Sequence, residues 1–133
     1  MGFRIHFVLI GLLFISRIAS AQVTMSFADA LEHARIQGPI KVMLTSESAE
    51  PIAMNMRRPG TRIFAEVSPI GELEEPGCRR LQVRITSPGS QLELKDGGTR
   101  DLDESFSLGM CANGTAPKNP FQFAAGQGQA RPR

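Results

Sequence analysis

The segment from Arg80 to Thr86, RLQVRIT, constrains the fold most strongly, because apolar and polar residues alternate along its whole length. Successive side chains of a β-strand point to opposite faces of its sheet. Leu81, Val83 and Ile85 would therefore share one face, and the polar residues between them the other. This alternation predicts a strand with one face buried and the other in solvent. We therefore expect a sheet that keeps one solvated face.

Further segments have the composition of short strands and are bounded by turn residues. They are Ile40–Leu44, Thr61–Val67, Gln91–Lys95 and Ser105–Cys111, with another short candidate near Ile52–Met56. Glycine and proline separate most of them, as in Pro59-Gly60 and Pro88-Gly89. Short strands with close turns predict a largely antiparallel sheet, closed or folded over as a small sandwich or barrel.

One helix is predicted ahead of these strands, over the sequence SFADALEHARIQGP. Ser26 is a candidate N-cap with Asp29 three residues later, and Gly38-Pro39 supplies the stop. Only Phe27 and Leu31 form a strongly apolar stripe, so we expect the helix to lie on the sheet. The predicted fold class is α+β, mainly β: one N-terminal helix packed on a small antiparallel sheet, sandwich or barrel, with one disulfide.

Residues 1–21 have the three parts of a cleaved signal peptide. Arg4 and His6 precede the apolar run Phe7–Ile15, and Ala19-Ser20-Ala21 offers a small-residue cleavage site. A membrane-spanning helix needs about 20 apolar residues, and this run is much shorter. We expect a periplasmic or secreted protein without a stable membrane anchor after cleavage. The alternative is an uncleaved N-terminal anchor.

Removal of the signal peptide also changes the charge balance. The whole chain has 15 Lys+Arg and 13 Asp+Glu, and residues 1–21 contain two arginines and no acid, so 13 of each remain. A net charge of zero removes the general argument for binding nucleic acid or an anionic membrane. The chain also lacks Trp and Tyr, the better stacking residues for single-stranded nucleic acid. No nucleic-acid partner is expected.

The remaining chain divides into a single α+β domain over residues 22–111 and a disordered tail over residues 112–133. The tail is rich in Gly, Pro, Gln, Asn and Ala and has no apolar periodicity. Phe121 and Phe123 alternate across Gln122, as in a short extended segment that docks on a sheet edge or a partner. The alternative is two isolated aromatic residues in a mobile end.

Cys78 and Cys111 are predicted to form a disulfide, because the chain is exported and the two residues flank predicted strands. A loop of this length would contribute about 3 to 4 kcal/mol through chain entropy. A metal site is the weaker interpretation, since His33 is the one imidazole outside the signal peptide. A reactive thiol is weaker still, because the sequence has no C-x-x-C motif. We expect no metal and no cofactor.

No motif in the sequence names a reaction. There is no G-x-S-x-G nucleophile elbow and no phosphate-binding loop. The acidic run Glu72–Glu75 is interpreted as a solvated turn, and Asp101–Glu104 as an acidic surface turn without EF-hand spacing. The chain is therefore predicted to be non-enzymatic. A hydrolase with a site around His33 is the least favoured alternative.

Arginine pairs are the remaining candidates for recognition, because guanidinium groups make bidentate contacts with phosphates and carboxylates. Nearby glutamates favour internal neutralisation of these arginines over contact with a partner. The residues considered for partner binding are Arg57, Arg58, Arg80, Arg84, Phe121 and Phe123.

Three segments resemble small two-cysteine periplasmic accessory proteins of bacterial conjugation and type IV secretion systems. They are SFADALEHARIQGPIKVMLTSESAEP, PGCRRLQVRIT and MCANG, and the resemblance covers residues 26–114. It implies an accessory role in a secretion or conjugation apparatus, with a protein partner in the cell envelope, and it transfers no site residues. The alternative function is a small secreted inhibitor or ligand-binding module.

Overall fold

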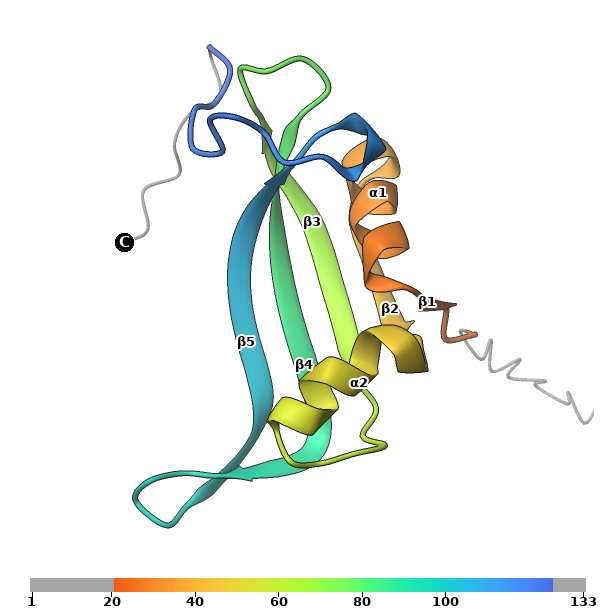
Figure 1. The fold of residues 1–133 in the computed structure, drawn as a ribbon, viewed down its shortest axis with the longest axis vertical. Coiled ribbons are helices and arrows are strands. Elements are labelled where there is room, and N and C mark those ends of the chain that lie inside the picture. The colour runs from red at the N-terminus through yellow and green to blue at the C-terminus, as the bar shows by residue number, and fades with distance from the viewer. Residues whose placement is uncertain (1–20, 126–133) are drawn as a thin grey trace, which may run out of the picture.

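The computed structural model describes residues 21–125, so the predicted signal peptide lies outside the described residues except for Ala21. The chain folds into one five-stranded sheet with the strand order β1-β2-β3-β4-β5 and two helices (Figure 1). The elements in chain order are β1 Thr24–Met25, α1 Phe27–Gln37, β2 Ile40–Leu44, α2 Ser46–Asn55, β3 Phe64–Glu72, β4 Arg79–Glu93, β5 Thr99–Met110 and a 3-10 turn Ala112–Gly114. The α+β, mainly β class is confirmed.

The sheet is mixed, which corrects the prediction of an antiparallel sheet. β2 pairs antiparallel with β3, β3 with β4 and β4 with β5, but β1 pairs parallel to β2. The chain passes from β1 to β2 through α1, and a helical crossover of this kind is what parallel neighbours require. The described strands form a single sheet with a linear strand order, so the predicted sandwich or barrel is also corrected.

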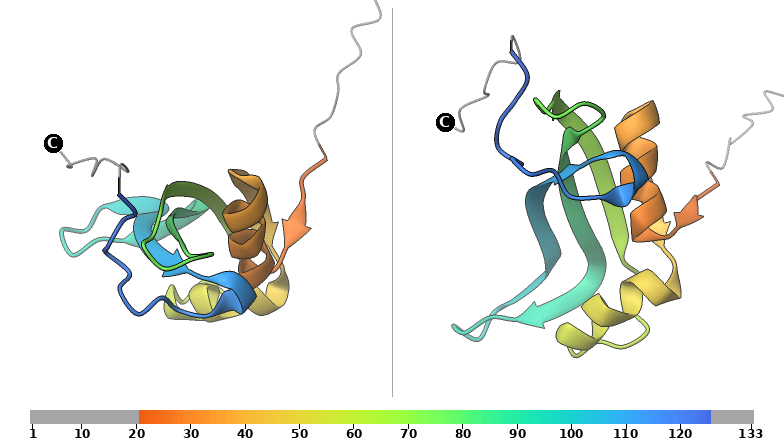
Figure 2. Two further views of the ribbon diagram at one scale, coloured as in Figure 1. Left: turned by 90° about the horizontal axis from the view of Figure 1, so that it is seen from above. Right: turned by 45° about the horizontal axis from the view of Figure 1, so that its top comes forward.

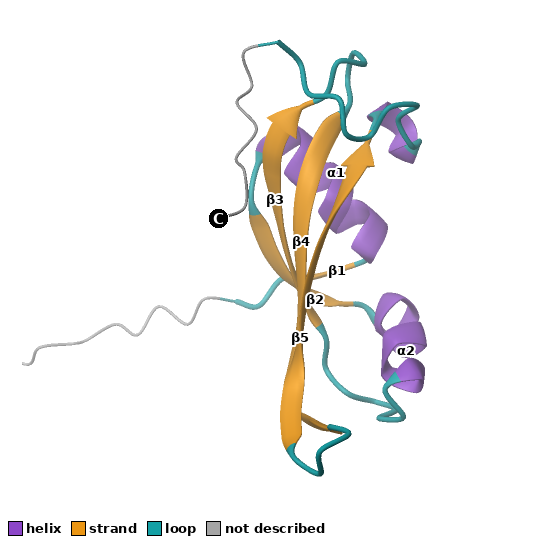
Figure 3. Ribbon diagram, turned by 90° about the vertical axis from the view of Figure 1, so that its left-hand side faces the viewer, coloured by secondary structure: helices purple, strands orange, loops and turns teal. Residues whose placement is uncertain are grey.

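Both helices lie on the same side of the sheet, as Figure 3 shows. Ala30 and Ala34 of α1 and Ala49 and Ala53 of α2 are buried in one cluster with the apolar residues of the strands. Alanine lets a helix backbone approach a sheet closely, since it fills little space. The helices therefore occupy the face that a second sheet would have covered.

The alternation along β4 is confirmed on its apolar side. Leu81 and Val83 are fully buried and Ile85 exposes 6% of its surface, while Arg84 on the other face is exposed. The strand is longer than predicted, because the segment expected as a separate strand, Gln91–Lys95, largely continues β4. A register shift between Ser87 and Leu92 accommodates Pro88-Gly89. Proline and glycine are tolerated at such bulges within a sheet.

The segment around Ile52–Met56 is not a strand, which corrects that prediction. Together with the polar segment before it, this segment forms α2, whose interior contains Pro51. Ala49 and Ala53 are four residues apart and so share one helix face, which is buried against the sheet. Tertiary burial of this face overrides the turn tendency of the serines and proline.

Residues 112–125, here called the strap, also differ from the predicted disordered tail. They run beside α1 and then back across the end of the sheet (Figure 2). Phe123 forms an antiparallel bridge with Leu73, and Pro117 is buried. Composition alone does not reveal these tertiary anchors. Residues 126–133 of the predicted tail lie outside the described residues.

Candidate functional site

An apolar groove opens on the helix-bearing side of the sheet, between the two helices and the last two strands. Its volume is about 320 Å³. The residues that line it are Phe27, Ser48, Ile52, Ile85, Leu102, Glu104 and Phe106. Most of the lining is hydrocarbon, and its polar groups come from Ser48 and Glu104.

The groove exists because the helices leave the helix-facing side of β5 partly uncovered. The register pairs Ile85 with Glu104 and Val83 with Phe106, so Leu102, Glu104 and Phe106 point to the same side as the core. Phe106 nevertheless exposes 44% of its surface. The helix-facing apolar side chains of β4 are therefore almost completely buried, whereas Phe106 on β5 is only partly buried.

The start of α1 and the start of α2 are joined at the rim of this groove. The Phe27 amide donates a hydrogen bond to Ser48 Oγ at 3.0 Å. Ser26 caps α1 through its own hydroxyl, which accepts from the Asp29 amide at 3.1 Å, as predicted. The first bond ties α1 to α2 here, and Phe27 and Ile52 are both partly buried against the core.

β5 is the last strand of the sheet, and its outer edge borders the groove. β4 is its neighbour, and among the described residues no backbone–backbone hydrogen bond joins β5 to another segment. The outer edge of such a strand presents amide and carbonyl groups that another extended chain can pair with. The groove and this edge together form a surface about one strand long.

Acidic residues are concentrated on β5. Asp101, Asp103 and Glu104 lie on it, against the single cation Arg100. Glu104 pairs with Arg100 at 2.9 Å, and both side chains remain more than half exposed. The segment predicted as an acidic turn is therefore part of an edge strand, and its carboxylates are displayed in a row.

Arg84 neutralises part of this acidic row on the face without helices. Its guanidinium donates to both oxygens of Asp103, at 2.8 and 2.7 Å, and to Glu66 at 3.3 Å. The hydrogen bonds from Arg84 hold the pKa of Asp103 below its ordinary value. Lys41 approaches the same Glu66 at 3.6 Å, so a charge ladder crosses the sheet from β2 to β5.

Asp101 has a different role, because its carboxylate holds the β4 bulge. It accepts a hydrogen bond from the Gln91 amide at 3.1 Å, and Gln91 has a positive φ of 45°. Backbone hydrogen bonds from Gly89 and Gln91 lower the pKa of Asp101. The backbone of the β4 bulge thus stabilises the charge of Asp101.

Arg80 is buried, although its strand position resembles that of the exposed Arg84. Its guanidinium donates to Ser107 Oγ at 2.6 Å and to the Pro120 carbonyl at 3.0 Å, and it stacks on the Phe121 ring at 4.6 Å from the centroid. Phe121 still exposes 73% of its surface. The structure therefore brings Arg80 and Phe121 together, with Arg80 anchoring the strap.

The other residues considered for partner binding lie apart. Arg57 and Arg58 follow α2 at the opposite end of β4 from Arg80, and the Arg58 guanidinium donates to the carbonyls of Ser90 and Gln91 at 3.3 and 3.4 Å. Phe123 is partly buried beside Leu73. The six residues do not form one surface.

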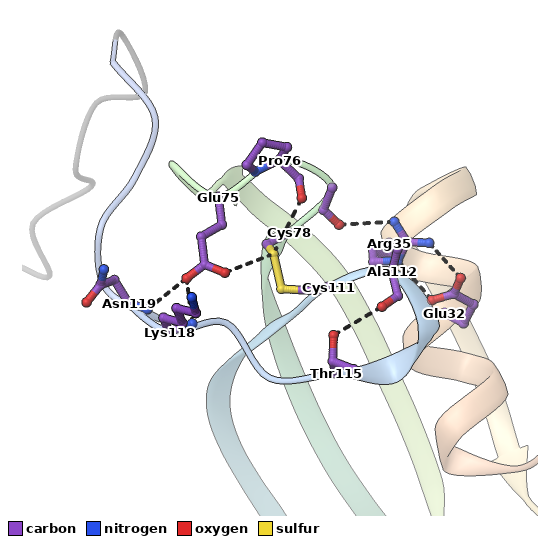
Figure 4. The surroundings of a disulfide bond; sticks show 11 residues. Glu32, Arg35, Glu75, Pro76, Cys78, Cys111, Ala112, Thr115, Lys118 and Asn119 are labelled. Carbon is purple, nitrogen blue, oxygen red and sulfur yellow. Dashed lines mark hydrogen bonds and ion pairs between the residues drawn. A yellow bond between two sulfur atoms is a disulfide. The ribbon is translucent and has the colours of Figure 1, made fainter.

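The Cys78–Cys111 disulfide is present, which confirms that prediction (Figure 4). The sulfur atoms are 1.94 Å apart. Arg79 pairs with Met110 in the β4–β5 ladder, so the disulfide continues this pairing by one position. It supports an oxidising compartment outside the cytoplasm. No helix in the described part of the chain is long and apolar enough to cross a membrane.

Glu75 lies beside the disulfide, on the side that faces the strap. One carboxylate oxygen accepts hydrogen bonds from the amides of Lys118 and Asn119. Glu75, Cys78 and Cys111 form the one cluster of three potential metal-ligating residues found in the described residues, and His33 is not part of it. The disulfide withdraws both thiolates from coordination, so the geometry suits a structural role for Glu75.

The sequence pattern placed Phe27 and Ile85 on apolar faces and Phe106 in the predicted strand Ser105–Cys111, where it alternates with polar neighbours, but it did not predict that the three share a groove. Leu102 and Glu104 continue the same alternation, but the acidic residues around them suggested a turn. Nothing in a single sequence marks a strand as the edge of a sheet.

Comparison with known proteins adds no assignment, because no protein-family model, curated protein or solved structure matched the chain.

Proposed function

We propose that this is a non-enzymatic protein that works outside the cytoplasm by binding a protein partner through the groove and the β5 edge. The observation that carries the proposal is the apolar groove beside an edge strand with no described backbone partner on its outer side. A contiguous apolar surface rimmed by polar residues is typical of interaction sites. Phe106, a large aromatic residue left 44% exposed, is its natural anchor.

A protein partner suits this surface better than a small ligand does. The groove volume of about 320 Å³ is at the lower end of ligand pockets, which span about 300 to 1,000 Å³. A small molecule would fill the groove and leave the strand edge unpaired. An extended segment of a partner would use both features at once. The small secreted inhibitor or ligand-binding module remains the alternative function.

The place of action is proposed to be the periplasm, as an accessory component of a secretion or conjugation apparatus. The disulfide, the predicted signal peptide and the resemblance to two-cysteine periplasmic proteins support this proposal. Arg80 and Arg84 are not proposed as the main partner contacts, because their guanidinium groups are engaged in the fold itself. Phe121 stays available as a secondary contact.

The experiment that tests this function is site-specific photo-crosslinking in the native host. A photoreactive phenylalanine analogue replaces Phe106 in one strain and Ile36 in another. Ile36 is an apolar residue of α1 that exposes 59% of its surface away from the groove. We expect position 106 to capture one envelope-apparatus subunit, identified by mass spectrometry, and position 36 to capture none.

Two results would count against the proposed function. If both positions capture the same set of proteins, the groove has no specific role. If position 106 captures nothing and native mass spectrometry of the purified protein shows a bound small molecule that Phe106→Ser removes, the ligand-binding alternative is correct.

A further inference from the structure

We propose that the partner segment binds as an added β-strand along the outer edge of β5, with apolar residues alternating with basic ones. This inference rests on the proposed function and specifies the chemistry of its partner. It follows from three properties of β5: its backbone pairing, the side chains on its helix-facing side, and its charge.

The backbone of β5 supplies the pairing. β5 spans Thr99–Met110 and runs antiparallel to β4 along most of this length. In the described part of the chain, β5 makes no backbone–backbone hydrogen bond on the side away from β4, and the Ser107 carbonyl accepts a side-chain hydrogen bond from Arg80 at 3.5 Å. Main-chain hydrogen bonds to such an edge provide affinity without requiring a particular sequence, and side-chain pockets then provide specificity.

The helix-facing side supplies the apolar specificity. Leu102 and Phe106 lie four residues apart on this side and both line the groove. Residues of an added strand at positions i and i+2 point to the same side and are about 7 Å apart, so two or three of them would lie along Leu102, Glu104 and Phe106. Valine or isoleucine at these positions would cover the exposed part of Phe106.

The charge of β5 supplies the basic specificity. Three carboxylates stand against Arg100 on this strand. Asp101 and Asp103 lie on the side of β5 away from the helices, and the side chain of Asp103 is 51% exposed although Arg84 already pairs with it. A carboxylate has about four lone-pair sites and can accept further donors. Lysine or arginine on the side of the added strand opposite its valines would therefore pair with these two carboxylates.

A second copy of this chain fits the same edge less well. In the antiparallel self-pairing that places Leu102 opposite Phe106 of the second copy, Glu104 falls opposite Glu104. Like charges directly opposite each other destabilise a strand pair. The charge pattern therefore favours a different, basic chain.

The test measures binding of labelled synthetic peptides to the full exported protein by fluorescence anisotropy. The probe is an alternating Lys/Val peptide of about nine residues, the length of a common strand. One control peptide alternates Glu and Val, and a second carries N-methyl groups on successive central amides of the Lys/Val peptide. We expect both controls to bind at least about tenfold more weakly, since one reverses the charge and the other blocks strand pairing.

Protein variants separate the groove from the rest of the surface. Phe106→Ser should weaken binding of the Lys/Val peptide about tenfold, whereas Ile36→Ser should leave it within about twofold. Asp103→Lys should reduce the preference for Lys/Val over Glu/Val, because Asp103 lies on the side of β5 that the charged peptide residues would share. This variant also tests the proposal if Phe106→Ser folds poorly by circular dichroism. Binding should also weaken with added salt, because the charges are exposed.

Equal binding of the N-methylated peptide would overturn strand addition, and equal binding of the Glu/Val peptide would overturn the basic partner. A dimer of the wild-type protein in sedimentation analysis that Phe106→Ser abolishes would assign the edge to a second copy instead. Photo-crosslinking at position 106 to an envelope subunit, combined with no peptide binding, would leave the proposed function standing and refute this binding mode alone.

Discussion

At the scale of single residues, the solvated face of the sheet is organised by cross-strand charge rather than by apolar burial. Glu66 is opposite Arg84 in the β3–β4 register, and Arg84 reaches across to Asp103 on β5. The hydrogen bonds to Asp103, and then its charge, raise the pKa of Arg84 above its ordinary value. Each exposed ion pair of this kind contributes little to stability, but together the pairs determine which charged side chains stay available to a partner.

The first prediction concerns the titration of Asp103. Its folded-state pKa should lie below the ordinary value of 3.8, and Arg84→Gln should raise it because the main stabilising hydrogen bonds are lost. A depressed carboxyl pKa contributes stability at pH values above the unfolded pKa, and this stability is lost as the pH falls through the folded pKa. Carboxyl-detected NMR titration measures both values.

Arg79→Gln is the matched control for this titration, because Arg79, the first residue of β4, pairs with Glu72 and not with Asp103. It should leave the pKa of Asp103 unchanged. If Arg84→Gln also left that pKa unchanged, the ion pair would not form in solution.

At the scale of elements, the disulfide and the strap cover one end of the sheet, beside α1. Gly109 faces the strap, and a Cβ placed there would lie 2.6 Å from Pro117 Cγ and 3.1 Å from Leu73 Cδ1. Glycine is needed here because the strap packs directly on the strand backbone. The strap, Arg80 and the small cluster of Leu73, Cys78, Cys111 and Phe123 therefore form one packed unit.

The second prediction concerns Cys78→Ser and Cys111→Ser. Each should lower the free energy of unfolding by about 3 to 4 kcal/mol, since either change opens the same loop, whose two cysteines are 33 residues apart. The double variant should resemble the single variants, because the cross-link is lost only once. Urea unfolding monitored by circular dichroism gives the three values.

The control for the disulfide is the exported wild-type protein treated with an alkylating agent without reductant. Its intact mass should show no modified thiol. Modification of both cysteines, or clearly unequal effects of the two serine substitutions, would contradict a single structural disulfide.

At the scale of the whole molecule, the fold is one sheet covered by two helices on one side, with its last strand left open. The core lies where α1 and α2 meet β2, β3 and β4, and cover decreases toward β5. Because the helices cover less of the sheet toward β5, this strand keeps both the groove and a free edge. The candidate site is thus a consequence of where the helices stop rather than of any local motif.

The third prediction concerns amide hydrogen exchange in the two long strands. Amides of β4 from Leu81 to Ile85 should all be protected, because β3 and β5 pair with both edges. Amides of β5 should alternate between slow and fast exchange, since every second one points away from β4. NMR-detected exchange resolves the individual amides.

Exchange should be compared at two protein concentrations, because self-association would protect the edge. Continuous protection along β5 at both concentrations would contradict an open edge. Addition of the Lys/Val peptide should slow the fast set alone.

Much of the local structure was predictable because it depends on neighbouring residues. Ser26, Asp29 and Gly38 mark α1, and the alternation around Val83 marks β4. The α2 segment was not predictable in this way, because Pro51 and its serines favour a turn until burial of Ala49 and Ala53 outweighs them. Likewise, the acidic residues on β5 suggested a turn, since the pairing that makes them a strand comes from β4.

The amino-acid sequence by itself determined the mainly β character, the helix at Ser26 and the residues of the disulfide. Each of these depends on local periodicity, on caps or on the chemistry of the compartment. The tertiary structure alone decided that Arg80 is buried while Arg84 is exposed, that residues 112–125 pack on the sheet, and that β5 is an edge. These properties depend on contacts between distant segments, and no short window of sequence contains both partners of such a contact.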